Sequence, residues 1–184
     1  MKYLASLFVP LFIFSTLGIA QNGDDFIRWS ATKKLSLSDF SIKIKRIEAT
    51  TSFAQFYISY KVKGFDFFTK NFNKKVDNYF VKSASWIDTT FDVRQALVYQ
   101  QTLFDLSEIY ARQFRKALRE NKGKIASGSG FMDELDRKYI SDFSKRRLDY
   151  DRDTRYGADS NKQKEWEAQI QKELADLNDF AYEK

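Results

Sequence analysis

The sequence predicts a single α+β domain in which an N-terminal antiparallel sheet of three to four strands packs against three C-terminal helices. Three observations favour this fold class. Apolar and polar residues alternate in the first half of the chain, as in strands with one buried face. In the second half apolar residues recur at steps of three and four, as in amphipathic helices. No repeat or linker divides the chain, so strands come first and helices follow.

The first twenty residues have the layout of a secretory signal peptide, with cleavage expected before Gln21. A basic start precedes an apolar run at residues 3–17, and small residues, Gly18 and Ala20, stand just before the cut. A membrane anchor is the alternative, but the run is short for a bilayer. We therefore expect an exported protein, periplasmic or secreted, without stable membrane insertion. Its single folded domain is expected to cover residues 21–184.

Alternation marks the strands of the first half. The clearest strand is expected at residues 53–63, FAQFYISYKVK, where every second residue is apolar. Residues 41–47 alternate isoleucine with lysine, and residues 76–87 form another strand after a turn expected at Gly64. Residues 26–87 thus predict three or four strands, most simply a meander. The buried face of the clearest strand is expected to carry Ala54, Phe56, Ile58, Tyr60 and Val62.

A long helix is expected from Val93 to Arg119, where apolar residues recur at helical spacing. Asp92 stands near its N-terminus, where the helix dipole favours an anion. The apolar stripe is wide, so we expect much of this helix to be buried. Its members are Leu97, Leu103, Phe104, Leu106, Tyr110, Ala111, Phe114 and Leu118.

Two more helices are expected after a loop at residues 121–130, NKGKIASGSG, whose three glycines break the pattern. The third helix is expected to start at Ser160, because SNKQ matches a capping box with this serine as the N-cap. The apolar faces comprise Phe131, Leu135, Tyr139 and Phe143 in the second helix, and Trp166, Ile170, Leu174 and Leu177 in the third.

The sequence contains no histidine and no cysteine. Zinc sites are built mostly from these residues, and Ser–His and Cys–His nucleophile systems need an imidazole. Their absence excludes most hydrolase chemistries and every disulfide, so the core alone must hold the exported domain together. Carboxylates, hard metals bound by carboxylates, and Ser–Lys arrangements are the chemistries that remain. We expect no cofactor.

The net charge is +6, but acidic and basic residues alternate along the chain. The densest basic run is KRR at Lys145–Arg147, with Asp142 and Asp149 beside it, and we interpret it as a solvated helix face. A nucleic-acid-binding protein would show a basic stripe with stacking aromatic residues. We therefore expect no nucleic-acid partner, while a weak attraction to anionic envelope surfaces stays open.

Three short motifs carry little weight. SATK at residues 30–33 matches Ser-x-x-Lys, but its partner motifs are absent. DYDRD at residues 149–153 resembles the start of a calcium loop, yet Thr154 and Ser160 replace the required Gly and Glu, which leaves at most a loose calcium contact. No carboxylate pair stands out for glycoside cleavage. A hydrolase with a carboxylate-based site is therefore kept only as an alternative.

The stretch LVYQQTLFDLSEIYARQF, residues 97–114, is similar to a helix built around a zinc site. A helical H-E-x-x-H places two imidazoles one turn apart, with a glutamate that activates the metal-bound water. Gln101, Phe104 and Asp105, followed by IYAR at Ile109–Arg112, match residues that flank such a motif. Further matching segments are WSATKKLSLSDF (29–40), ATTSF (49–53), SWID (85–88), YDRDTRYG (150–157) and QKEW (163–166).

In their order and spacing these segments resemble a bacterial family of secreted zinc-dependent proteases, domain of unknown function 922. The family pattern is H-E-Q-x-H-F-D, then IYAR, then Y-D-x-E-T-x-H-G. Leu37 departs from it, because tryptophan is usual at that place. The resemblance covers nearly the whole chain after the expected signal peptide, and it implies a zincin-like arrangement of the helices.

The resemblance also implies that every residue of the metal site is replaced. Tyr99 and Leu103 stand where the family has two histidines, and Gln100 stands where it has the glutamate. Tyr156 replaces the histidine of T-x-H-G, the implied third ligand. A neutral phenol is a poor zinc ligand, an amide takes up no proton, and leucine has no lone pair. We therefore expect no catalytic, cofactor-binding or metal-binding residue at these degenerate positions.

We expect Leu103 to be a core residue. Tyr99 and Tyr156 either fill the core as well or face each other across the former site, where they would bind Gln100 or a ligand. The leading hypothesis is a non-catalytic, exported relative of the proteases that binds a peptide or an envelope component. The alternatives are a structural or interaction protein whose cleft has filled in, and the carboxylate-based hydrolase. An open pocket over Gln100 would favour the first hypothesis, and a closed one the second.

Overall fold

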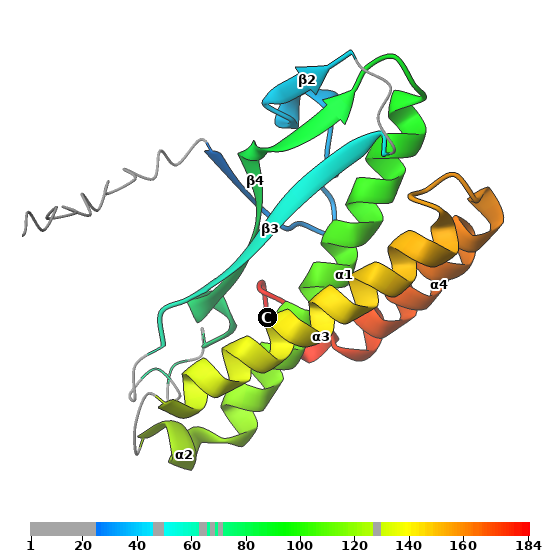
Figure 1. Ribbon diagram of the computed structural model, residues 1–184. Helices are drawn as coiled ribbons and strands as arrows, with labels where there is room; N and C mark the ends of the chain where they lie inside the picture. Colours follow the sequence, from blue (N-terminus) through cyan, green and yellow to red (C-terminus); the bar gives the residue numbers. More distant parts are fainter. Residues whose placement is uncertain (1–24, 46–49, 63–65, 67–68, 70–71, 127–129) are drawn as a thin grey trace, which may run out of the picture.

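The computed structural model confirms the α+β class: one four-stranded sheet is followed by three long helices (Figure 1). The expected signal peptide and the expected turn at Gly64 lie outside the described residues. The residues that the structure describes are 25–45, 50–62, 66, 69, 72–126 and 130–184. The strands are β1 (Phe26–Arg28), β2 (Ile42–Ile44), β3 (Ser52–Tyr60) and β4 (Val76–Asp88). The long helices are α1 (Val93–Glu120), α3 (Gly130–Thr154) and α4 (Ser160–Asp176).

β4 is the centre of the sheet, so the expected meander is wrong. β3 pairs antiparallel with one edge of β4, while β1 and β2 share the other edge. β1 is antiparallel to β4, but β2 is parallel to it, with Ile42 opposite Trp86. The pleat of β3 is as expected, because Ala54 and Phe56 are buried and Tyr57 is exposed. In the part of the chain that the structure describes, β3 pairs with β4 only, which leaves its outer edge without a partner strand.

α1 runs between the sheet and the other two helices, and it begins where the sequence predicts (Figure 1). Asp92 caps its first turn by accepting a hydrogen bond from the backbone N–H of Gln95 at 3.0 Å. Every residue of α1 from Thr102 to Arg112 is buried, because β3, β4, α3 and α4 surround it. The apolar ones other than Ala111 belong to the main hydrophobic cluster with Phe40, Phe56, Phe80 and Ile87.

Two details of the helical half differ from expectation. The segment expected as a loop contains a short helix, α2 (Lys122–Ala126), before residues 127–129, which lie outside the described residues. The N-cap of α4 is Asp159 rather than Ser160: its carboxylate accepts from the backbone N–H groups of Asn161 and Lys162. An aspartate carries a full charge at the positive end of the helix dipole, which favours it over a serine one residue later.

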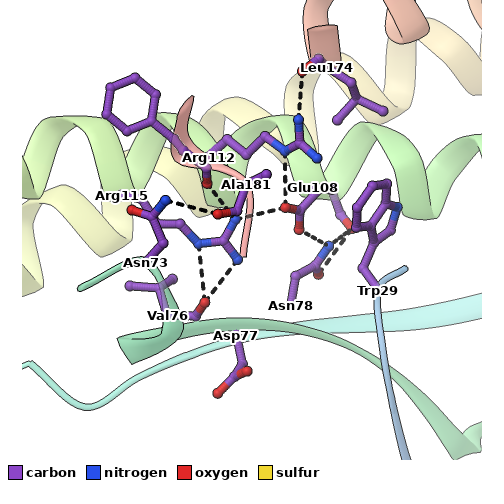
Figure 2. A network of polar contacts seen from close by, with 12 residues as sticks. Trp29, Asn73, Val76, Asp77, Asn78, Glu108, Arg112, Arg115, Leu174 and Ala181 are labelled. Atoms are coloured by element: carbon purple, nitrogen blue, oxygen red, sulfur yellow. Dashed lines mark hydrogen bonds and ion pairs between the residues drawn. The ribbon is translucent and has the colours of Figure 1, made fainter. Parts of the chain in front are cut away.

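A buried polar network lies where α1 crosses β4 (Figure 2). Glu108, 1% exposed, accepts hydrogen bonds from Arg115 at 2.7 Å and Arg112 at 3.2 Å. On the sheet side, Asn78 of β4 donates to the same carboxylate at 3.3 Å. Arg115, Arg112 and Asn78 thus share the single negative charge of this carboxylate, and their hydrogen bonds stabilise it in the protein interior.

The two arginines extend this network to the C-terminal segment (Figure 2). Arg115 donates to the backbone oxygens of Val76, at 2.8 and 3.2 Å, and of Phe180 at 3.0 Å. Arg112 donates to the backbone oxygen of Leu174, at the end of α4, at 2.6 Å. Asn73 donates to the backbone oxygens of Asp179 and Ala181. The last residues of the chain are thus attached to α1 and to the start of β4.

We expect Arg115→Ala to lower the free energy of unfolding by about 3–5 kcal/mol, because removing one partner leaves a buried charge under-compensated. Lys116→Ala is the matched control on the same helix. Lys116 is exposed and its nearest carboxylate, Glu120, is 3.9 Å away, so the change should stay within about 0.5 kcal/mol. Urea unfolding followed by circular dichroism measures both, and equal effects would contradict the role assigned to the network.

Candidate functional site

Tyr99, the first predicted ligand position, faces α3 and is only 2% exposed. Its ring stacks on Tyr150, with ring centroids 5.2 Å apart and planes 11° apart. Its hydroxyl donates a hydrogen bond to the carboxylate of Asp151, and Arg147 lies 3.8 Å from that carboxylate. The partners of Tyr99 are therefore Tyr150 and Asp151 of α3, rather than Tyr156 across an open site.

Gln100, at the position of the family's glutamate, is fully buried. Its amide donates to the hydroxyl of Ser52 at 2.9 Å, whereas its carbonyl oxygen has no hydrogen-bond partner among the described residues. An unpaired buried acceptor costs about 1–3 kcal/mol. This position therefore retains a buried polar group that packing alone does not require.

Leu103 is fully buried in the main hydrophobic cluster, as expected. Its side chain offers no ligand atom, Gln100 is an amide, and the phenol of Tyr99 is already bound to Asp151. These residues do not fit a zinc ion, which needs deprotonated or imidazole ligands. No chemistry through a metal follows from this site.

Tyr156 lies in the loop between α3 and α4, and this loop contacts α1 at Tyr99. The amide of Gln95 donates to the backbone oxygen of Gly157 at 2.6 Å. A Cβ added at Gly157 would lie 2.8 Å from the Cβ of Tyr99. The ring of Tyr156 itself is 49% exposed. The structure thus brings this loop to the first predicted ligand position, but leaves the tyrosine ring half in solvent.

The loop holds three successive residues in the left-handed backbone region. The φ angles are 50° at Arg155, 56° at Tyr156 and 87° at Gly157. Such angles are unfavourable for the first two residues, so neighbouring contacts must hold them. Thr154 is central to this, since its hydroxyl accepts from the N–H of Gly157 and its backbone oxygen accepts from the N–H of Asp159.

The weak motifs do not form sites. DYDRD lies within α3, where Asp151 turns inward to Tyr99 while Asp149 and Asp153 pair with Arg152 on the surface. It is therefore not a calcium loop. SATK forms an exposed bend closed on the hydroxyl of Ser30. Among the described residues no group of three or more carboxylates is arranged to bind a metal.

One hollow of this region lies beside β3, away from the predicted ligand positions. A groove of about 880 Å³ separates β3 from α3, and Tyr99, Gln100, Leu103 and Tyr156 are not among its lining residues. We call it the β3–α3 groove. Its lining comprises Gln55, Phe56, Tyr57, Ile58 and Tyr60 of β3, Ser107 of α1, and Asp136, Ile140, Phe143, Ser144, Arg147 and Leu148 of α3.

Polar contacts close the groove at both ends. Arg147 donates to the backbone oxygen of Ala54 at 3.2 Å, and the hydroxyl of Tyr60 donates to Asp133 at 3.2 Å. β3 rises about 20 Å between these points, and α3 rises about 21 Å. The strand and the helix therefore run side by side in opposite directions. Ile140, between the closed ends, is 50% exposed, and Leu148, one residue beyond Arg147, is 68% exposed.

Sequence reasoning missed the groove and the inward role of Asp151. A signal for Asp151 was present, because Y-D of the family pattern matches Tyr150 and Asp151. Ile140 and Leu148 gave no signal, since they stand outside the expected apolar face of α3. They differ from that face by one residue, or about 100° around the helix.

Comparison with protein-family models, with curated proteins and with solved structures finds no significant match for this chain. Membership of the protease family and a zincin-like helix arrangement stay predictions. Within the described ranges, no helix combines the length and the apolar character that crossing a bilayer requires.

We expect Gly157→Ala to destabilise the protein by about 1–3 kcal/mol, because the new Cβ would overlap Tyr99 in a left-handed backbone. Gly123→Ala in α2 is the matched control: nothing lies within 4 Å of the place that its new methyl group would take, and alanine is the better helix residue. Thermal unfolding measures both. A neutral Gly157→Ala would mean that the loop does not pack on α1.

We expect Asp151 to make stability depend on pH. Burial raises its pKa above 3.8 and outweighs the opposing effects of the Tyr99 hydroxyl and Arg147. The folded state therefore binds the proton more tightly, so this contribution is present below pH 3.8 and is lost as pH rises through the raised pKa. Relative to the wild type, Asp151→Asn should gain stability between pH 4 and pH 7 in urea unfolding. A relative loss over that range would contradict the assignment.

Proposed function

We propose that this protein is an exported, non-catalytic relative of the zinc-dependent proteases that it resembles. In this proposal it binds an extended peptide in the β3–α3 groove and does not cleave it. The single observation that carries the proposal is an open groove along an unpaired strand edge, next to a filled metal-site position. Export rests on the signal-like first twenty residues.

The filled position supports loss of catalysis. Tyr99, Tyr150 and Asp151 occupy the space beside α1 with mutually satisfied contacts. The unpaired carbonyl oxygen of Gln100 supports descent from a chain with a different residue there, because a position selected only for packing would favour an apolar side chain. Burial of Gln100 is the outcome expected for a filled-in cleft, not for an open pocket at that place. The proposed peptide site is therefore the β3–α3 groove and not the space over Gln100.

The edge of β3 supports an extended peptide as the partner. A peptide strand can pair with an unpaired sheet edge through main-chain hydrogen bonds, and pockets for alternate side chains then give selectivity. Phe56, Phe143, Ile140 and Leu148 supply apolar surface for such side chains. The closed ends limit the bound segment to the part of β3 between Ala54 and Tyr60.

A fluorescent peptide in which valine alternates with serine tests the proposal. The wild type is expected to bind it and leave it intact, whereas Ile140→Ser combined with Leu148→Ser should weaken binding by about tenfold or more through lost apolar contact. Both side chains are at least half exposed, so the fold should tolerate the change.

Ile42→Ser is the matched control, since this isoleucine is 44% exposed but belongs to β2, outside the groove. Equal binding by the double variant and the control would refute the groove as the binding site. Elemental analysis of the same preparation should find no stoichiometric zinc. One tightly bound zinc per chain, or cleavage of the peptide, would overturn the non-catalytic assignment.

A further inference from the structure

A second hollow lies on the face of the sheet that the helices do not cover, and it reaches the same strand. It has a volume of about 610 Å³, and we call it the basic hollow. Tyr57 lines both the basic hollow and the β3–α3 groove and is 47% exposed, so the two meet across β3. The lining residues are Phe26, Arg28, Tyr57, Ser59, Lys61, Lys74, Lys75, Asp77 and Tyr79.

The basic hollow carries a net positive charge. Its lining has four cations and one carboxylate, a formal charge of +3. Part of this charge is neutralised. Arg28 pairs with Asp77 at 2.7 Å, and carboxylates outside the lining lie near two of the three lysines. Those contacts join Lys75 to Asp66 at 3.2 Å and Lys74 to Glu183 at 3.9 Å.

The solvent-facing side chains of β3 carry no acid. Tyr57 and Ser59 of β3 line the basic hollow together with Lys61, which follows the strand and is exposed. Tyr57 stands opposite Tyr79, and Ser59 opposite Asp77, in the β3–β4 pair. A strand added at the free edge of β3 would place its own side chains directly beside this row.

A single peptide strand can reach both hollows, because its side chains alternate between the two faces of a sheet. A peptide paired with β3 therefore presents every second residue to the apolar β3–α3 groove and the residues between them to the basic hollow. We propose that the partner segment alternates apolar residues with acidic ones, the apolar side chains contacting Ile140 and Leu148 and the carboxylates facing Lys61. This inference rests on the proposed function and names its ligand class.

Three fluorescent peptides of equal length test it with the full chain: valine alternating with glutamate, with serine or with lysine. We expect the glutamate peptide to bind about fivefold or more tightly than the serine peptide, and the lysine peptide to bind most weakly, because opposite charges pair favourably across strands. The preference should shrink as salt is raised, since these groups are exposed. Fluorescence anisotropy gives the three dissociation constants.

Lys61→Gln should reduce the preference for glutamate over serine by about twofold or more, because this preference depends on the lysine's charge. Lys172→Gln is the matched control, an exposed lysine of α4 outside both hollows. Equal affinities for all three peptides would overturn the acidic specificity and leave the groove proposal intact. Failure of all three to bind would refute the proposed function, and this inference with it.

Discussion

The carboxylate of Glu108 is the constraint on which the rest of the fold depends. It is buried at the middle of a helix that is covered on all sides, so its charge is tolerable only where Arg112, Arg115 and Asn78 meet it. This requirement fixes the rotation of α1 about its own axis. Tyr99 is nine residues earlier, about two and a half turns, so it must face away from Glu108. The network against β4 thereby directs Tyr99 toward α3, where Tyr150 and Asp151 receive it.

The burial of Tyr99 and Leu103 follows from that orientation of α1. A helix held in this rotation keeps residues 99 and 103 pointing inward whether or not they bind a metal. Tyrosine and leucine at these positions therefore place large side chains in the interior, and the surroundings fit them: Gly157 allows the loop to lie against Tyr99, and Asp151 accepts a hydrogen bond from its hydroxyl. Gln100 is the position where this fit is incomplete, since its NH2 group has a hydrogen-bond partner among the described residues and its carbonyl oxygen has none.

The sequence predicts what local pattern determines and misses what distant residues decide. The start of α1, the pleat of β3 and the core position of Leu103 follow from spacing, because each depends on neighbours along the chain. The sheet order does not, because β2 joins β4 in parallel across more than forty residues. The interpretation of the basic run at Lys145–Arg147 as a solvated face holds for the exposed Lys145 but is wrong for the two arginines, for the same reason. Arg146 instead forms a two-bond pair with Glu173 of α4, and Arg147 crosses to β3.

These same long-range contacts explain why a groove persists. α3 is fastened to α4 through Arg146 and to β3 through Arg147 and Asp133, so it cannot approach the strand further without breaking these contacts. The α3 stripe that faces β3 steps by four residues and includes Ser144, whose side chain is too short to fill the gap. A helix designed only to cover the sheet would carry a larger apolar residue there. The contacts hold α3 at both ends of the groove, and the short side chain of Ser144 leaves space between them. The β3 edge therefore stays accessible, as pairing with an incoming strand requires.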